Sequence, residues 1–287
     1  MKTCFFNFPK KGQSYTQIID KAKAVGFDAV ELYTACELIS PDTDAAKSIG
    51  EYAGIKQMDI GCISVGANLT REDNTIEVEK LKKYVDVAKI VGSPFLHHTL
   101  GSALHWRFEP IPVAKIINRI VKAEREVCDY AGEKGIMVLN ENQGFIMNGI
   151  ERFDEYLSVL DHPNHGLVAD VGNIMFVGEK PESFVGRFAP FIKHLHVKDY
   201  LLKPGAGLYP GNEWLLTNNG DYLLDTVIGY GAVDFEKVFH ILISAGYDGY
   251  YSMECGAYTE EPDRLAKGLR NIRFYYENTV HKLSHLA

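Results

Sequence analysis

Four successive apolar segments from residue 136 onward each end on a side chain that could bind a metal ion. These side chains are Glu141, Asp170, His196 and Glu254. Three converging carboxylates would repel one another and titrate abnormally unless a cation neutralised them. Together with one imidazole they suit one divalent ion with five or six ligands, so Mn²⁺ or Mg²⁺ is expected first, with Co²⁺ or Zn²⁺ as substitutes. An octahedral ion would keep about two positions open for adjacent oxygens of a small molecule.

Other polar residues near the ends of apolar segments are candidates for contact with that small molecule. Glu31 ends an earlier segment, although it could equally form a hydrogen bond or a salt bridge. His97 and His98 are consecutive, so only one of them can lie on the inner face of the sheet, and the other is expected to pack beneath a helix. The remaining candidates are Asn173, Lys198 and Trp214.

Short apolar, β-rich runs alternate with amphipathic helical stretches along the chain, and the alternation repeats eight times. The expected strands span residues 3–8, 29–33, 57–65, 95–99, 136–141, 166–171, 192–198 and 249–254. The expected helices span residues 15–25, 44–53, 76–91, 113–134, 150–160, 181–191, 235–245 and 263–281. Strands that alternate with helices in this way pair in parallel, and the helices then cover the sheet.

Eight strand–helix units predict one α/β domain over residues 1–287, a parallel eight-stranded (β/α)8 TIM barrel. The chemistry of such barrels lies at the carboxyl ends of the strands, where the four candidate ligands stand. An open doubly wound sheet is the alternative, but no G-x-G-x-x-G motif follows the first strand. The long irregular stretch 200–233 is expected to be a lid or binding loop, unless it is a decorative insertion.

Composition restricts the partners that the protein could have. A formal net charge of −8 argues against binding to nucleic acid. No apolar run approaches the roughly 18 residues that would cross a membrane, and no signal peptide is visible, so a cytoplasmic protein is expected. The five cysteines are expected to be reduced thiols. Trp106, Phe108 and Pro110 could form a contact in a homo-oligomer or roof the site.

The ordered set of these motifs resembles the xylose-isomerase-like sugar phosphate isomerase/epimerase family, over the whole chain. That family contains ketose 3-epimerases, hydroxypyruvate isomerases and inosose dehydratases, and more distantly type-IV apurinic endonucleases. The motifs that carry the resemblance are Ala29-Val30-Glu31-Leu32, Glu141-Asn142, Asp170-x-Gly172, His196-Val197-Lys198-Asp199 and Gly246-Tyr247-Asp248-Gly249 leading to Met253-Glu254.

The resemblance implies an enzyme of carbohydrate metabolism, a metal-dependent isomerase or epimerase that acts on a small polyhydroxy-carbonyl compound. It also implies that Glu141 and Glu254 both bind the metal and move the proton. One glutamate would remove a carbon-bound proton to give a metal-stabilised enediolate, and the other would return it. The expected partner is a sugar or keto-sugar, which the lack of an obvious anion site suggests is unphosphorylated.

Two departures from the family leave the reaction open. Asn173 stands where the epimerases commonly have a histidine, and the arginine expected after the seventh strand is missing. A metal-dependent lyase or dehydratase that acts on a keto-sugar or inosose is one alternative, because it shares the same first step. A sugar-binding barrel without catalysis is another. The endonuclease branch is disfavoured, because no Asp-x-His follows His196.

Overall fold

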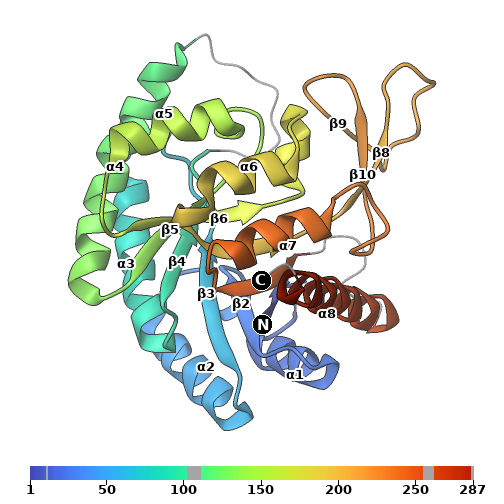
Figure 1. The fold of residues 1–287 in the computed structure, drawn as a ribbon. Coiled ribbons are helices and arrows are strands. Elements are labelled where there is room, and N and C mark those ends of the chain that lie inside the picture. Colours follow the sequence, from blue (N-terminus) through green and yellow to red (C-terminus); the bar gives the residue numbers. More distant parts are fainter. Residues whose placement is uncertain (11, 102–110, 255–261, 286–287) are drawn as a thin grey trace.

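The computed structural model describes residues 1–10, 12–101, 111–254 and 262–285, and Trp106, Phe108 and Pro110 lie outside these ranges. Eight parallel strands form a closed barrel in the order β1-β11-β7-β6-β5-β4-β3-β2, which confirms the predicted fold (Figure 1). The barrel strands are β1 (Lys2–Asn7), β2 (Ala29–Tyr33), β3 (Asp59–Val65), β4 (Phe95–His98), β5 (Met137–Glu141), β6 (His165–Asp170), β7 (Ile192–Val197) and β11 (Tyr250–Glu254).

Helices follow the barrel strands and surround the sheet (Figure 1). They are α1 (Tyr15–Val25), α2 (Thr43–Lys56), α3 (Thr75–Val91), α4 (Val113–Lys134), α5 (Ile150–Leu160), α6 (Pro181–Phe188), α7 (Phe235–Ser244) and α8 (Pro262–Ser284). Short 3-10 turns are η1 (Cys36–Leu38), η2 (Asn173–Val177) and η3 (Ala189–Phe191). No helix in the described ranges combines the length and apolar character needed to cross a membrane.

Local sequence signals set the ends of these elements. Ser14 caps α1, because its hydroxyl accepts the N–H of Gln17 while the Gln17 side chain accepts the N–H of Ser14. Gly26 ends the same helix in the left-handed conformation, at φ 102°, which glycine adopts without a side-chain clash. The chain therefore turns back to β2 within a few residues.

The register of the sheet brings the polar strand ends to one rim. Asp170 on β6 lies opposite His196 on β7, and His196 lies opposite Ser252 on β11. Side chains alternate along a strand, so His194 and His196 both face the barrel interior. The register shifts between Val30 and Glu31, where β2 pairs with β3. Such an irregularity re-aims the side chains next to it.

The sequence suggested that the segment 200–233 is irregular throughout, but part of it is regular. It contains a three-stranded antiparallel sheet in the order β8-β10-β9, formed by β8 (Tyr200–Lys203), β9 (Leu215–Leu216) and β10 (Tyr222–Asp225). Leu223 is buried in a small cluster with Phe176 and Tyr200, which ties this sheet to the barrel. Glycines and prolines flank these short strands, so the local sequence pattern did not predict that they pair.

Candidate metal and catalytic site

The structure brings together the four residues that the sequence predicted as ligands. Glu141, Asp170, His196 and Glu254 stand at the ends of β5, β6, β7 and β11, and each is buried. Each offers one ligand atom within 4.8 Å of the ligand atoms of the others. Neighbouring parallel strands end at the same rim, so residues far apart in the chain meet there.

His196 is the centre of this group. Its Nδ1 lies 2.9 Å from Glu141 Oε1, 2.9 Å from Glu254 Oε2 and 3.9 Å from Asp170 Oδ2. Burial disfavours a charged imidazole, but Glu31 and Glu141 raise the pKa of His196 well above its usual value. Nδ1 therefore faces a strongly negative space that either a proton or a cation can neutralise.

Lys198, a predicted substrate contact, also points into this space. Its Nζ lies 2.6 Å from Glu254 Oε1 and 3.1 Å from Asp170 Oδ2, and it donates to Asn173 Oδ1 at 3.4 Å. Asn173 in turn donates to Glu141 Oε1 at 3.2 Å. Burial opposes the ammonium form, but Asp170 and Glu254 raise the pKa of Lys198 well above its usual value. The side chain is thus a buried cation.

The oxygens of Asp170 have different surroundings. Oδ1 accepts the backbone N–H groups of Gly172 at 2.8 Å and of Asn173 at 2.7 Å, whereas Oδ2 turns toward His196 and Lys198. Burial, together with Glu254 and Glu141, raises the pKa of Asp170 well above its usual value in spite of Lys198. The backbone thus holds one oxygen and leaves the other for a ligand.

A divalent ion fits this set of donors. Asp170 Oδ2 and Glu254 Oε2 are buried without a hydrogen bond of acceptable geometry, although Lys198 and His196 lie near them. Three carboxylates and one imidazole are the donors that a hard or borderline ion takes with five or six ligands. The unsatisfied oxygens point to the same conclusion as the residue types.

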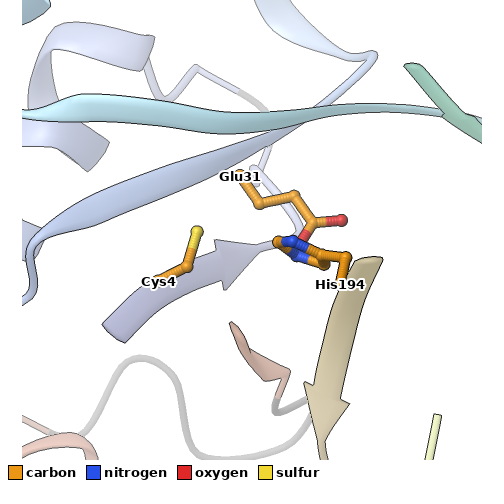
Figure 2. Close-up of side chains that lie close together, drawn as sticks. All are labelled: Cys4, Glu31 and His194. Atoms are coloured by element: carbon orange, nitrogen blue, oxygen red, sulfur yellow. The ribbon is translucent and has the colours of Figure 1, made fainter. Parts of the chain in front are cut away.

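Glu31 lies within the barrel interior, beneath the four ligands. Oε1 accepts from Ser64 Oγ and from His196 Nε2 at 3.0 Å. Oε2 accepts from Ser252 Oγ at 2.7 Å and from His194 Nε2 at 2.8 Å. Figure 2 shows the carboxylate of Glu31 against the ring of His194. Its oxygens accept hydrogen bonds from protein donors, which is the hydrogen-bonding role that the sequence left open for Glu31.

The two consecutive histidines face opposite ways. His97 points inward, with Nε2 at 3.5 Å from Glu141 Oε2 and Nδ1 at 3.0 Å from Ser64 Oγ. His98 points outward, with Nε2 at 3.1 Å from Glu124 Oε2 on α4. His98 is therefore withdrawn as a substrate contact, because the alternation of β4 turns it away from the barrel interior.

Trp214 lies outside the barrel strands. It lies half-buried in the connection between β8 and β9, where its backbone N–H donates to the carbonyl of Gly211. This position belongs to the small antiparallel sheet rather than to the barrel strands. Sequence reasoning, for its part, did not single out Ser64, which donates to Glu31 and contacts His97. Its place opposite His97 in the β3–β4 register could have indicated it.

A family model described as xylose isomerase-like TIM barrel matches residues 19–275. The chain belongs to this family. An inosose dehydratase of Geobacillus thermodenitrificans (strain NG80-2) is 29% identical over 252 residues, which cover 84% of this chain and 82% of that protein. An inosose dehydratase of Bacillus thuringiensis (strain Al Hakam) is 26% identical over 150 residues, 51% of this chain and 49% of that protein. The chain thus matches only about half the length of some of these curated relatives.

Solved structures of the family share the fold. A 3-keto-D-glucoside 4-epimerase from E. coli superposes with a TM-score of 0.73 at 14% identity, over 96% of this chain and 99% of that chain. A xylose isomerase-like TIM barrel protein from Mycobacterium smegmatis in complex with magnesium superposes with a TM-score of 0.72 at 16% identity, over 94% and 90% of the two chains. At these identities the likeness is one of fold.

Proposed function

We propose that the protein is a divalent-metal-dependent isomerase or epimerase that acts on a small polyhydroxy-carbonyl compound such as a keto-sugar. The observation that carries the proposal is the position of two carboxylates beside one nitrogen. Glu141 and Glu254 come from different strands, and each has an oxygen 2.9 Å from His196 Nδ1. A substrate carbon held in that space would have two carboxylate bases within reach.

The proposed ligands are Glu141, Asp170, His196 and Glu254, and Mn²⁺ is the ion we expect. When bound, the ion would act as a Lewis acid toward adjacent oxygens of the substrate and so acidify a neighbouring C–H.

The side chains of the protein then move the proton. One glutamate takes the proton from the carbon beside the carbonyl, and the other delivers a proton to the opposite face or to the next carbon. Burial raises the pKa of each carboxyl, but His196 beside Glu141 and Lys198 beside Glu254 hold both pKa values below the usual range. Either glutamate can therefore act as the base, and the glutamate that returns a proton must first take one up from solvent water. Asn173 and Lys198 would orient substrate hydroxyls, since both can donate hydrogen bonds.

Dehydration is the second candidate, and Lys198 favours it. Expulsion of a hydroxyl after proton removal needs an acid near the leaving oxygen, and the buried ammonium of Lys198 lies 2.6 Å from Glu254. The curated relatives described above are inosose dehydratases. The first step would be the same proton abstraction, so one experiment can separate the two outcomes.

The test is a screen of ketoses, inososes and keto-acids in D₂O with the Mn²⁺-loaded protein. An isomerase or epimerase incorporates deuterium at one carbon and yields a product of otherwise unchanged composition. A dehydratase yields a product that has lost one water. Absence of both exchange and water loss with every compound, from a protein that binds Mn²⁺, would leave a binding function and contradict the proposal.

A further inference from the structure

The interior layer beneath the proposed ligands holds a carboxylate that the proposed reaction does not use. Glu31 is 0% exposed, and burying an ionised group is costly unless it is paired and hydrogen-bonded. Four side chains from three strands surround it: Ser64 of β3, His194 and His196 of β7, and Ser252 of β11. The register shift between Val30 and Glu31 occurs at this residue, where it re-aims the side chain.

The hydrogen bond from His196 to Glu31 fixes which nitrogen of the ring carries hydrogen. Nε2 lies 3.0 Å from Glu31 Oε1, and a carboxylate only accepts, so Nε2 carries a hydrogen. The lone pair of the neutral ring then lies on Nδ1, which faces Glu141 and Glu254 at 2.9 Å each. A histidine that binds a metal through one nitrogen commonly donates its other N–H to a carboxylate in this way.

We infer that Glu31 is a positioning residue that holds His196 with Nδ1 presented to the divalent ion, and that Ser64, Ser252 and His194 hold Glu31 in place. The inference rests on the proposed function for the presence of the ion. Glu31 then affects the affinity of the site for the ion and does not contact the substrate.

A thiol lies beside the same carboxylate. Cys4, Glu31 and His194 offer ligand atoms within 4.8 Å of one another, and Figure 2 shows them side by side. The oxygens of Glu31 already accept from four side chains, so an ion bound there would have to displace them. Cys4 is therefore a matched control: it is fully buried in the same layer, but the oxygens of Glu31 keep all four donors without it.

The test is a titration of wild type, Glu31→Gln, Glu31→Asp and Cys4→Ala with Mn²⁺, with free ion read by electron paramagnetic resonance. Glu31→Gln is expected to weaken binding by about 10- to 100-fold, the range typical for loss of such a carboxylate. Glu31→Asp keeps the charge and should recover part of the affinity, whereas Cys4→Ala should match wild type. If Glu31→Gln bound Mn²⁺ as tightly as wild type, the inference would be wrong, but the proposed function would stand. The same would hold if only Cys4→Ala lost the ion.

A measurement on the wild type covers the case in which Glu31→Gln does not fold. In ¹⁵N spectra of the Zn²⁺-loaded protein, His196, identified by its absence from His196→Ala, should carry hydrogen on Nε2 and not on Nδ1. Hydrogen on Nδ1 would overturn the inference. A wild type that binds no Mn²⁺ would overturn both this inference and the metal dependence of the proposed function.

Discussion

Two clusters of buried polar side chains lie on opposite sides of the same pair of strands. His97 and Glu141 face the barrel interior, whereas their neighbours His98 and Asn140 face the helices outside. The outer cluster has one carboxylate, Glu124 of α4, at 3.1 Å from His98. Within it, Asn140 Oδ1 accepts from Tyr156 and His165, each at 2.7 Å.

The two clusters differ in charge balance. The inner cluster combines the carboxylates of Glu31, Glu141, Asp170 and Glu254 with three basic side chains whose pKa values these carboxylates raise, His97, His196 and Lys198. The outer cluster pairs one carboxylate with an imidazole, as a structural contact requires. We infer that the excess of carboxylates serves the proposed metal site, because folding alone gives no reason to keep it.

The largest expected difference between the two clusters is in how their mutation changes catalytic activity. Glu141→Gln should lower the rate of solvent deuterium exchange into the substrate by about 10²- to 10⁴-fold, because a positioned base is lost. Glu124→Gln, on the other side of the sheet, should stay within a few-fold of wild type. Comparable losses in both variants would show that the inner cluster has no special part in the reaction.

Stability should show the reverse order. Glu124→Ala removes one partner of a buried pair and should lower the free energy of unfolding by about 3–5 kcal/mol, measured by urea denaturation. Asp170→Asn removes a charge that its buried surroundings disfavour, as the raised pKa of Asp170 indicates, so in the absence of metal it should unfold at an equal or higher urea concentration. An ion-free Asp170→Asn variant that is less stable than Glu124→Ala would reverse the comparison.

Removal of the ion should affect the inner cluster alone. At a Mn²⁺ concentration of 100 times the Kd, binding adds about 2.7 kcal/mol to stability, and a chelator should remove this increment. The increment should persist in Glu124→Gln and disappear in His196→Ala. Thermal melts with and without chelator measure it, and an unchanged increment in His196→Ala would argue that the ion binds elsewhere.

The outer cluster should have its own pH dependence. Burial lowers the pKa of His165 from 6.5 to about 4 in the folded chain. The unfolded chain therefore binds more protons between these values, so stability should fall as the pH is lowered from about 6.5 to 4, by about 2–3 kcal/mol for this group. His165→Gln should flatten the profile in that window. An unchanged slope would assign the effect to other groups, such as His194, whose pKa burial also lowers.

Much of this arrangement could be predicted from the sequence because it follows from short-range rules. Alternation of apolar strands and amphipathic helices predicted the barrel, and several helices have the predicted bounds, among them α1, α4 and α5. Polar residues at the ends of barrel strands meet at one rim, and this rule alone groups Glu141, Asp170, His196 and Glu254.

What could not be predicted depends on long-range register. The side to which His97 or His98 points is set by how β4 pairs with its neighbours, and the pattern alone left both open. Glu31 was expected at the rim, but the irregularity beside it and donors from β3, β7 and β11 place its carboxylate in the interior. The small sheet in 200–233 forms through pairing of strands that are too short to leave a clear pattern.

The most direct test of the account is the number of Mn²⁺ ions bound per chain, measured by titration of wild type, Glu141→Gln, His196→Ala and Glu124→Gln. The account predicts one tightly bound ion in wild type and in Glu124→Gln, with binding weakened in Glu141→Gln and in His196→Ala. The assignment of the inner cluster as the metal site would be contradicted if wild type bound no ion. It would also be contradicted if His196→Ala still bound the ion and Glu124→Gln did not.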